Sequence, residues 1–200
     1  MPELFAALLA FTAARHSHLC PRQVIGVRMG LAGAAALGLE VPRKDKRLLV
    51  ILETDGCFAD GIEAATLTTI GHRTLRVEDY GKVAATFIDA SNGSSVRLVP
   101  RGEIRQEACT YAPEQNSRYQ AQLQAYQVMP EETMFRFEDV RLKLPLDRLI
   151  GEPGSRVNCS RCGEEIINQR EIIRSGETLC RACAGEAYYT PCPPSSSPPT

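Results

Sequence analysis

The chain has 200 residues, of which 44% are hydrophobic and 24% are charged, and its formal net charge is −1. This length accommodates one medium-sized domain and a small appendage. A charge so close to zero argues against nucleic acid or an anionic membrane surface as the main partner, because proteins usually bind both through clustered Lys and Arg. No uncharged apolar run is long enough to cross a bilayer, so we expect no membrane segment.

The N-terminal stretch, residues 2–14, predicts an amphipathic helix that belongs to the folded protein. Its apolar side chains recur at helical spacing: Leu4, Phe5, Leu8, Leu9 and Phe11. The stretch carries Glu3 and lacks the basic segment with which a signal peptide begins. We therefore expect a cytoplasmic protein.

A second helix and a buried strand follow. Pro21 is suited to the first position of a helix that ends near Gly38, and the many Gly and Ala residues between them indicate close packing. The near-continuous apolar run "RLLVILETDG" predicts an interior strand. The segment "GIEAATLTTIG" after it indicates a helix or a loop.

The next region alternates between strands and turns. Residues 73–100 predict three strands, and the Asn92–Gly93 dipeptide between two alternating runs predicts a hairpin. Residues 114–127 predict a polar helix, and "MFRFEDVRLKLP" predicts a last strand. Residues 1–150 together predict a mixed domain of helices and strands.

The remainder of the chain divides into three parts. Residues 151–156 contain Gly and Pro and predict a linker, and residues 157–189 predict a second, smaller domain. Residues 190–200 are rich in Pro and Ser, so we expect a disordered tail in which Cys192 has no role.

Four cysteines of the small domain have the spacing of a zinc site. Two CxxC pairs stand 17 residues apart: Cys159, Cys162, Cys180 and Cys183. Redox dithiols and disulfides are the alternatives, but in a reducing compartment this pattern indicates tetrahedral Zn²⁺. We expect a structural zinc ribbon, because so short a unit has too little apolar mass to fold without metal. Its Arg residues are offset by Glu, which favours a protein partner over nucleic acid.

The stretch "HSHLCP" places His16, His18 and Cys20 within five residues. The simplest alternative is a loop that contains them by chance. If Pro21 begins a helix, however, Cys20 is its N-cap, where the helix dipole and free amides favour a thiolate. On an extended approach His16 and His18 point to the same side.

A second cluster follows the predicted interior strand, which ends in Glu53, Asp55 and Cys57. Ligands gather at strand ends in open α/β sheets. Cys57 with His18 and Cys20 would form a mixed nitrogen and sulfur site for Zn²⁺ or another transition metal, with one position open. Glu53, Asp55 and Asp60 are candidates for hydrogen-bond acceptors or oxygen ligands there.

Several motifs in order resemble the family named after the E chain of formylmethanofuran dehydrogenase: "HSHLCP", "GVRMGL", "ETDGCFADGI", "TIGHRTLRVEDYGKVAATF", "YQVMPEETMFRF" and the CxxC pairs. The resemblance implies an α+β domain with a mixed sheet packed with helices, often dimeric, followed by a zinc ribbon. It also implies a metal held by His18, Cys20 and Cys57, with His16 as the other histidine of the motif.

One position departs from the family pattern. The family usually has "TGCT" where this chain has "TLTT", so Thr68 stands where a cysteine is common. Cys109 would replace that cysteine only if its loop lies near the site.

These features favour a metal-binding accessory or regulatory protein over an enzyme. The N-terminal domain would bind a transition metal in connection with molybdenum or tungsten enzymes, and the ribbon would contact a protein partner. The alternatives are a metal-dependent enzyme with Glu53 or Asp55 as base, and a non-catalytic component of a larger oxidoreductase. The chain has no cysteine run of the iron–sulfur type.

Overall fold

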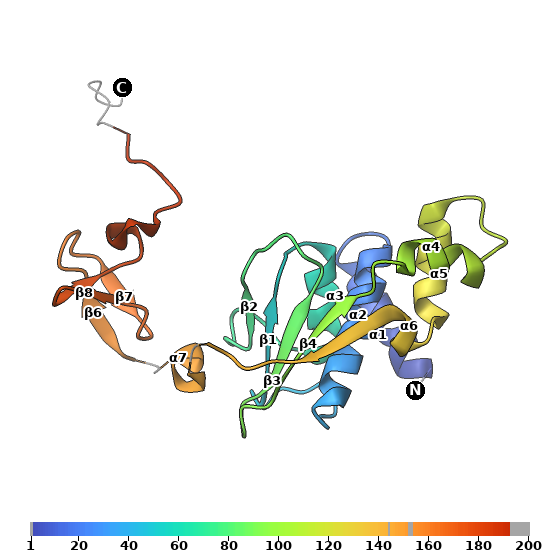
Figure 1. Ribbon diagram of the computed structural model, residues 1–200, viewed down its shortest axis with the longest axis horizontal. Coiled ribbons are helices and arrows are strands. Elements are labelled where there is room, and N and C mark those ends of the chain that lie inside the picture. Colours follow the sequence, from blue (N-terminus) through green and yellow to red (C-terminus); the bar gives the residue numbers. More distant parts are fainter. Residues whose placement is uncertain (1, 144, 152–153, 193–200) are drawn as a thin grey trace. The chain divides into compact units, whose positions relative to one another are not determined.

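The computed structural model describes residues 2–143, 145–151 and 154–192 (Figure 1). Internal contacts divide the chain into two compact units, residues 1–143 and residues 144–200. The predicted linker includes residues 152–153 and the predicted tail includes residues 193–200, and both pieces lie outside the described residues. No helix in the described part of the chain is long and apolar enough to cross a membrane.

The first unit contains a five-stranded mixed sheet with the strand order β2-β1-β3-β4-β5. Its strands are β1 (Leu48–Leu52), β2 (Leu75–Val77), β3 (Ala85–Asp89), β4 (Ser95–Pro100) and β5 (Phe135–Asp139). β1 and β2 are parallel, and the other neighbouring pairs are antiparallel. The α+β class with a mixed sheet, as predicted, is therefore confirmed.

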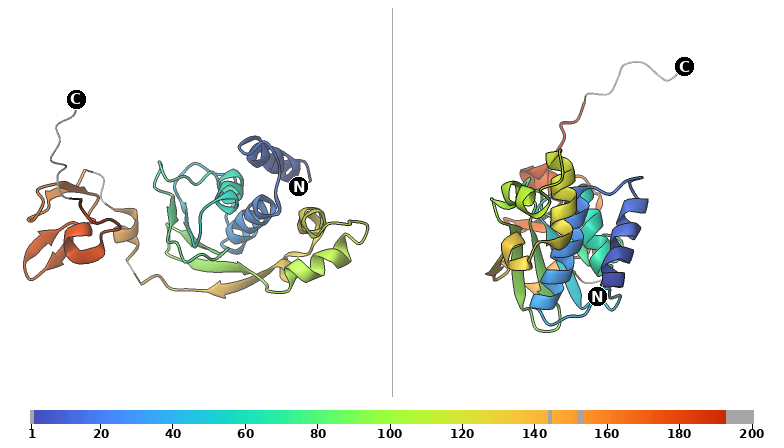
Figure 2. Two further views of the ribbon diagram at one scale, coloured as in Figure 1. Left: turned by 90° about the horizontal axis from the view of Figure 1, so that it is seen from above. Right: turned by 90° about the vertical axis from the view of Figure 1, so that its right-hand side faces the viewer.

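Two helices, α2 (Pro21–Ala36) and α3 (Cys57–Thr66), cover one face of this sheet, and α1 (Pro2–Ala14) packs on their outer side (Figure 2). Because side chains alternate along a strand, Leu48, Val50 and Leu52 of β1 all point into the core beneath the helices. Val24 of α2 and Phe58 of α3 are fully buried in the same core. The apolar run of β1 therefore has the interior position that its sequence predicts.

Glycine residues allow α2 and α3 to approach until their backbones touch. A Cβ atom added at Gly26 would lie 2.3 Å from the carbonyl oxygen of Phe58, and one added at Gly61 would lie 2.3 Å from that of Gln23. No side chain fits in such a space. This contact fixes the N-terminal halves of the two helices relative to each other.

Three further helices connect β4 to β5: α4 (Ile104–Tyr111), α5 (Arg118–Val128) and α6 (Glu131–Met134). The sequence did not predict α4, and the predicted helix at residues 114–127 begins at Arg118 instead. Arg28 of α2 donates hydrogen bonds to the carbonyl oxygens of Tyr126 (3.1 Å) and Met129 (2.8 Å). These bonds attach the end of α5 to the middle of α2.

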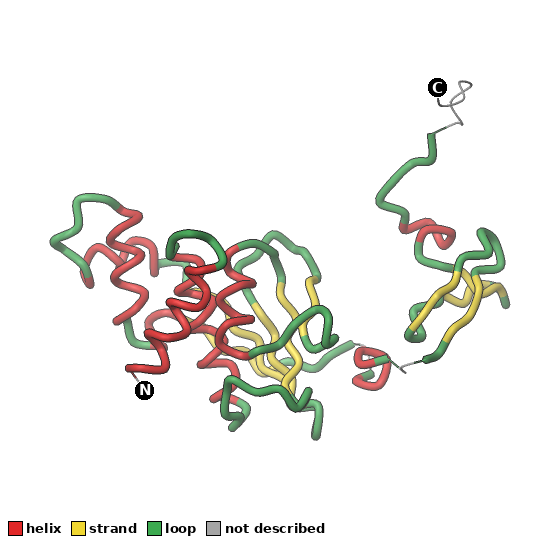
Figure 3. The backbone as a smooth tube through the Cα atoms, turned by 180° about the vertical axis from the view of Figure 1, so that it is seen from behind, coloured by secondary structure: helices red, strands yellow, loops and turns green. Residues whose placement is uncertain are grey.

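The second unit begins with the short helix α7 (Leu146–Ile150) and continues as two hairpins (Figure 3). β6 (Arg156–Asn158) pairs with β7 (Glu165–Ile167), and β8 (Ile172–Arg174) pairs with β9 (Glu177–Leu179). A helical turn, η1 (Ala182–Glu186), follows. Among the described residues, the buried apolar cluster of the second unit consists of only Cys159, Ile166, Leu179 and Ala184.

Candidate metal centres

The four ribbon cysteines converge at one point of the second unit. The sulfur atoms of Cys159, Cys162, Cys180 and Cys183 all lie within 4.8 Å of one another. Those of Cys162 and Cys180 are 3.9 Å apart. A regular tetrahedron of sulfur atoms around Zn²⁺ has edges of about 3.8 Å, given bonds of about 2.3 Å. The cluster therefore has the dimensions of a structural zinc site.

Backbone amides and neighbouring sulfurs give these thiols different proton affinities. Backbone N–H groups of Cys162 and Cys180 lower the pKa of Cys159 to about 6, and the amide of Cys180 lies 3.3 Å from its sulfur. The hydrogen bond with Cys180 and then burial raise the pKa of Cys183 to about 12. Four thiolates in this space need a cation to offset their mutual repulsion.

In the first unit, Cys20 and Cys57 occupy the N-termini of adjacent helices. Cys20 is the N-cap of α2 and is buried, and its backbone N–H donates to the side-chain oxygen of Gln23 (2.8 Å). Gln23 in turn donates to the carbonyl oxygen of Thr12 near the end of α1 (2.8 Å). Cys57 is the first residue of α3 and follows Gly56, whose φ of 79° requires a residue without a Cβ.

The two thiols are close enough to interact. Burial raises the pKa of Cys57, and a hydrogen bond with the Cys20 side chain raises it further. Burial and then the charges of Cys20 and Cys57 raise the pKa of the phenol of Tyr119 on α5. Its hydroxyl donates to the carbonyl oxygen of Leu19 (3.4 Å). No sequence pattern pointed to this tyrosine, which comes from a distant helix.

His16 contacts α3 and is partly exposed, with 31% of its side chain accessible to solvent. Its Nε2 is hydrogen-bonded to Oδ2 of Asp60, in the first turn of the helix that Cys57 begins. Arg15 holds the other oxygen of Asp60 (3.3 Å) and also pairs with Glu63 (2.7 Å). When Nε2 carries the proton, Nδ1 of His16 presents a lone pair, which is the state that a metal-binding imidazole requires.

His18 is exposed and has no hydrogen bond or ion pair with any described residue. Within the described ranges, the groups of three or more His, Cys, Asp or Glu with ligand atoms inside 4.8 Å comprise the ribbon cluster alone. The structure thus brings Cys20 to Cys57 and His16 to Asp60, but within 4.8 Å it joins neither these two pairs to each other nor His18 to either of them. Two thiols and imidazole nitrogens are suitable donors for Zn²⁺ and similar ions.

The carboxylates at the end of β1 have different surroundings. Glu53 is buried and accepts hydrogen bonds from Arg97 of β4 through both oxygens (2.5 and 2.8 Å). Arg97 also pairs with Glu138 of β5 (2.8 Å). Asp55 is exposed. Of the three carboxylates considered from the sequence, Asp60 is the one that contacts a candidate ligand.

The positions of Thr68 and the remaining cysteines are also defined. The hydroxyl of Thr68 is buried and lies 2.8 Å from that of Thr66. Cys109 is exposed on α4, and Cys192 is exposed as well. No described contact connects Cys109 with Cys20 or Cys57.

An α+β domain followed by a four-cysteine cluster defines a class of metal-binding proteins with a C-terminal zinc finger. Comparison with family models agrees with this class. Residues 15–136 match the family described as FmdE, molybdenum formylmethanofuran dehydrogenase operon, and residues 153–189 match the prokaryotic dksA/traR C4-type zinc finger. The chain belongs to the FmdE family. The four-cysteine cluster and the zinc-finger match together indicate zinc binding.

Two individual proteins are similar to this chain. A probable S-adenosyl-L-methionine-binding protein of Archaeoglobus fulgidus is 27% identical over an aligned length of 194 residues, and the match covers 86% of this chain and 51% of the relative. The chain therefore spans about half the length of that relative. The crystal structure of a tungsten formylmethanofuran dehydrogenase FmdE-like protein from Syntrophus aciditrophicus covers 93% of this chain and 95% of its own, with 20% identity and a TM-score of 0.57. This second likeness concerns the fold.

Proposed function

We propose that this chain is a metal-binding accessory or regulatory protein, with one transition-metal site in the first unit and a structural zinc site in the ribbon. The observation that carries the proposal is the meeting of the Cys20 and Cys57 thiols at the N-termini of two helices. Helix N-termini stabilise thiolates, and thiolates bind Zn²⁺ and related ions.

The donor set would consist of the two thiolates with His16 or His18. Asp60 would orient the His16 ring through its hydrogen bond to Nε2. Bound there, the metal would supply a Lewis-acid centre with one position open to water or to a small ligand. Membership of the FmdE family supports a link with molybdenum or tungsten enzymes.

Metal analysis of the purified chain tests this proposal. We expect two metal ions per wild-type chain and one in the Cys20→Ser variant. Cys109→Ser is the matched control, because it removes an exposed thiol of the same unit that no described contact joins to Cys20 or Cys57. Two ions in Cys20→Ser would exclude the site in the first unit.

The ribbon is proposed to contact a protein partner. Its exposed apolar side chains support this role: Ile167, Ile173, Tyr188 and Tyr189. Capture of a partner by the whole chain, and its loss after removal of residues 157–200, is the expected result. Equal capture by both forms would contradict a partner role for the ribbon.

The chain is also proposed to form a homodimer, which the family resemblance supports and sedimentation equilibrium checks. All eight cysteines are free, which suits the proposed cytoplasmic location.

A second candidate function is binding of S-adenosyl-L-methionine, which the description of the archaeal relative states for that protein. A groove of about 390 Å³ in the first unit supports it, since small-ligand sites begin at about this size. Phe137 offers a ring for stacking, and Asp139 offers an acceptor for hydroxyl groups. Calorimetric titration is expected to show weaker binding in Phe137→Ala and unchanged binding in Tyr80→Ala, an exposed ring outside the groove. No saturable binding to the wild type would rule this function out.

A further inference from the structure

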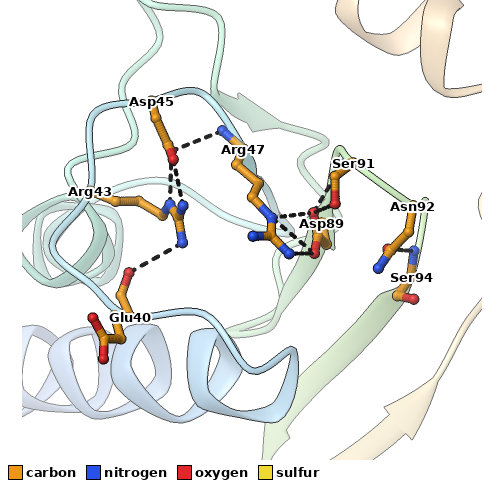
Figure 4. A network of polar contacts seen from close by, with 8 residues as sticks. All are labelled: Glu40, Arg43, Asp45, Arg47, Asp89, Ser91, Asn92 and Ser94. Carbon is orange, nitrogen blue, oxygen red and sulfur yellow. Dashed lines mark hydrogen bonds and ion pairs between the residues drawn. The ribbon is translucent and has the colours of Figure 1, made fainter.

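Residues 43–47, between α2 and β1, form a short basic segment that ion pairs hold in place (Figure 4). Arg43 donates to Asp45 (2.8 Å), and the backbone N–H of Arg47 donates to the same oxygen (3.2 Å). The Arg47 side chain bonds to Asp89 at the end of β3 (2.7 Å). The backbone N–H of Arg43 also donates to the carbonyl oxygen of Thr66 (3.2 Å). The carboxylates of Asp45 and Asp89 are thus committed to Arg43 and Arg47, whereas the exposed carboxylate of Glu40, which precedes them, forms no ion pair with a described residue.

Two cations of this segment remain without a partner. Lys44 and Lys46 are exposed, and neither forms an ion pair with any carboxylate in the described part of the chain. They flank Asp45, whose pKa the Arg43 guanidinium holds well below its usual range, so that it stays paired as an anion with Arg43. The two ammonium groups are therefore not neutralised by an ion pair, and the unpaired acidic group close to them is Glu40.

The same lysines border a small cavity. It is lined by Arg43, Lys44, Lys46, Leu48, Leu67, Thr68, His72 and Thr74. Four of these eight side chains are basic, and none is acidic. The enclosed volume is about 10 Å³, which is room for one water-sized atom. A single oxygen of a larger anion fits inside, and the rest of the anion would remain among the lysines at the mouth.

The carbonyl groups at the C-terminus of α3, which borders the cavity, repel an anion only weakly. The C-terminus of α3 ends here, and helix C-termini repel negative charge. However, the carbonyl oxygen of Ile62 accepts from the Thr66 hydroxyl (2.7 Å), and that of Thr66 accepts from Arg43. The Thr68 hydroxyl is engaged with Thr66 (2.8 Å) and the Arg43 guanidinium with Asp45, so the donors left for a ligand are the ammonium groups of Lys44 and Lys46.

We propose that this cavity binds a tetrahedral oxyanion of the phosphate class, with one oxygen inside and the others bound by Lys44 and Lys46. Charge-assisted hydrogen bonds from Lys and Arg are the usual means of holding such an anion. The anion is either free in solution or the phosphate group of a nucleotide. The site lies away from Cys20 and Cys57, because it is formed at the C-terminal end of α3 and those thiols lie at helix N-termini.

Calorimetric titration of the whole chain with inorganic phosphate, at constant ionic strength set with chloride, tests the proposal. We expect saturable binding to the wild type and binding at least about tenfold weaker in the Lys44→Gln/Lys46→Gln variant. Lys82→Gln is the control, because it removes an exposed lysine that does not line the cavity. Thermal unfolding verifies that each variant is folded.

Adenosine monophosphate and adenosine distinguish the sources of the anion. Tighter binding of the nucleotide than of inorganic phosphate, again lost in the double variant, identifies a nucleotide phosphate. Binding of inorganic phosphate alone identifies the free ion. The proposal is overturned if neither phosphate compound binds saturably, or if Lys82→Gln weakens binding as much as the double variant does.

Discussion

The hydrogen bond between His16 and Asp60 joins the turn after α1 to α3, across 44 positions of the sequence. Arg15, directly before His16, holds the same carboxylate and that of Glu63. Asp60 therefore stands behind His16 as carboxylates commonly stand behind metal-binding imidazoles, where they fix the ring and its tautomer.

Replacement of Asp60 tests this role in the proposed metal site. Asp60→Asn is expected to weaken metal binding by the first unit by about 10- to 100-fold, because the His16 ring loses its anionic partner. Competition with a chromophoric chelator measures the affinity. Glu63→Gln is the matched control, since Glu63 pairs with Arg15 but not with His16. Equal affinities of the two variants would contradict the role of Asp60.

The sequence predicted part of this residue-scale arrangement. Pro21 marked the start of α2, so the position of Cys20 at the N-cap was predictable. The partner of Glu53 was not, because its pairing with Arg97 depends on the order and register of β1, β3 and β4, which no local pattern reveals. A ligand role for Glu53 stays a prediction that the Arg97 contact disfavours.

At the scale of elements, the contact between α2 and α3 determines where the two thiols lie. Cys20 and Cys57 begin these helices, and the close approach at Gly26 and Gly61 lies about one to two turns beyond them. The small residues of α2 indicate close packing already in the sequence. The sequence could not identify which helix α2 approaches.

Gly26→Ala is expected to force α2 and α3 apart. The added methyl group would lie 2.3 Å from the carbonyl oxygen of Phe58, and this backbone atom cannot rotate away. Overpacking of this kind costs about 1–3 kcal/mol of unfolding free energy, which urea denaturation measures. Gly102→Ala is the control, because nothing lies within 4 Å of a Cβ added there. Equal stability of Gly26→Ala and wild type would mean that the helices do not touch as described.

The turn between β3 and β4 depends on Asp89, which is 1% exposed. Asp89 accepts from the Arg47 side chain (2.7 Å), the Ser91 hydroxyl (2.7 Å) and the Ser91 backbone (2.9 Å). The Arg47 guanidinium and then the Ser91 hydroxyl hold the pKa of this carboxyl well below its usual range.

Asp89→Asn is expected to lower the unfolding free energy at neutral pH by about 1–3 kcal/mol, because the charge-assisted bonds are lost. The folded-state pKa is depressed, so the stabilisation is present above the unfolded-state value of about 4 and disappears as pH falls below it. The difference between wild type and variant should therefore narrow in acid. Asp45→Asn, at an exposed carboxylate of the same network, should change stability little. A difference that does not depend on pH would contradict this account.

At the scale of the whole chain, the sequence predicted the fold class and the cysteine cluster better than it predicted contacts between individual residues. Four cysteines in two CxxC pairs were sufficient to predict the cluster, because their spacing leaves few other arrangements. Helix α4 was missed, because only Ile104 and Ala108 are buried on it, which is too little periodicity to recognise.

Removal of zinc is expected to unfold the ribbon and leave the first unit intact. The apolar cluster of the ribbon is small, whereas the first unit has an extensive core. Hydrogen exchange with and without a strong chelator should show lost protection in residues 157–189 only. Cys180→Ser should reproduce this effect, and Cys192→Ser, at an exposed cysteine, should not. Retained protection in the chelated ribbon would show that the metal is dispensable for its fold.

The direct backbone contact of α2 with α3 has a mechanical consequence. No side chain intervenes between α2 and α3 at Gly26 and Gly61. A displacement of one helix therefore cannot be absorbed there by rotamer changes, and we expect the two helices to move together. Cys57 lies at one end of α3, and Leu67, which borders the basic cavity, lies just past the other. If a metal bound to the thiols displaced α3, the displacement would reach the proposed oxyanion site at the other end of the helix, and binding at the two proposed sites would then be thermodynamically linked.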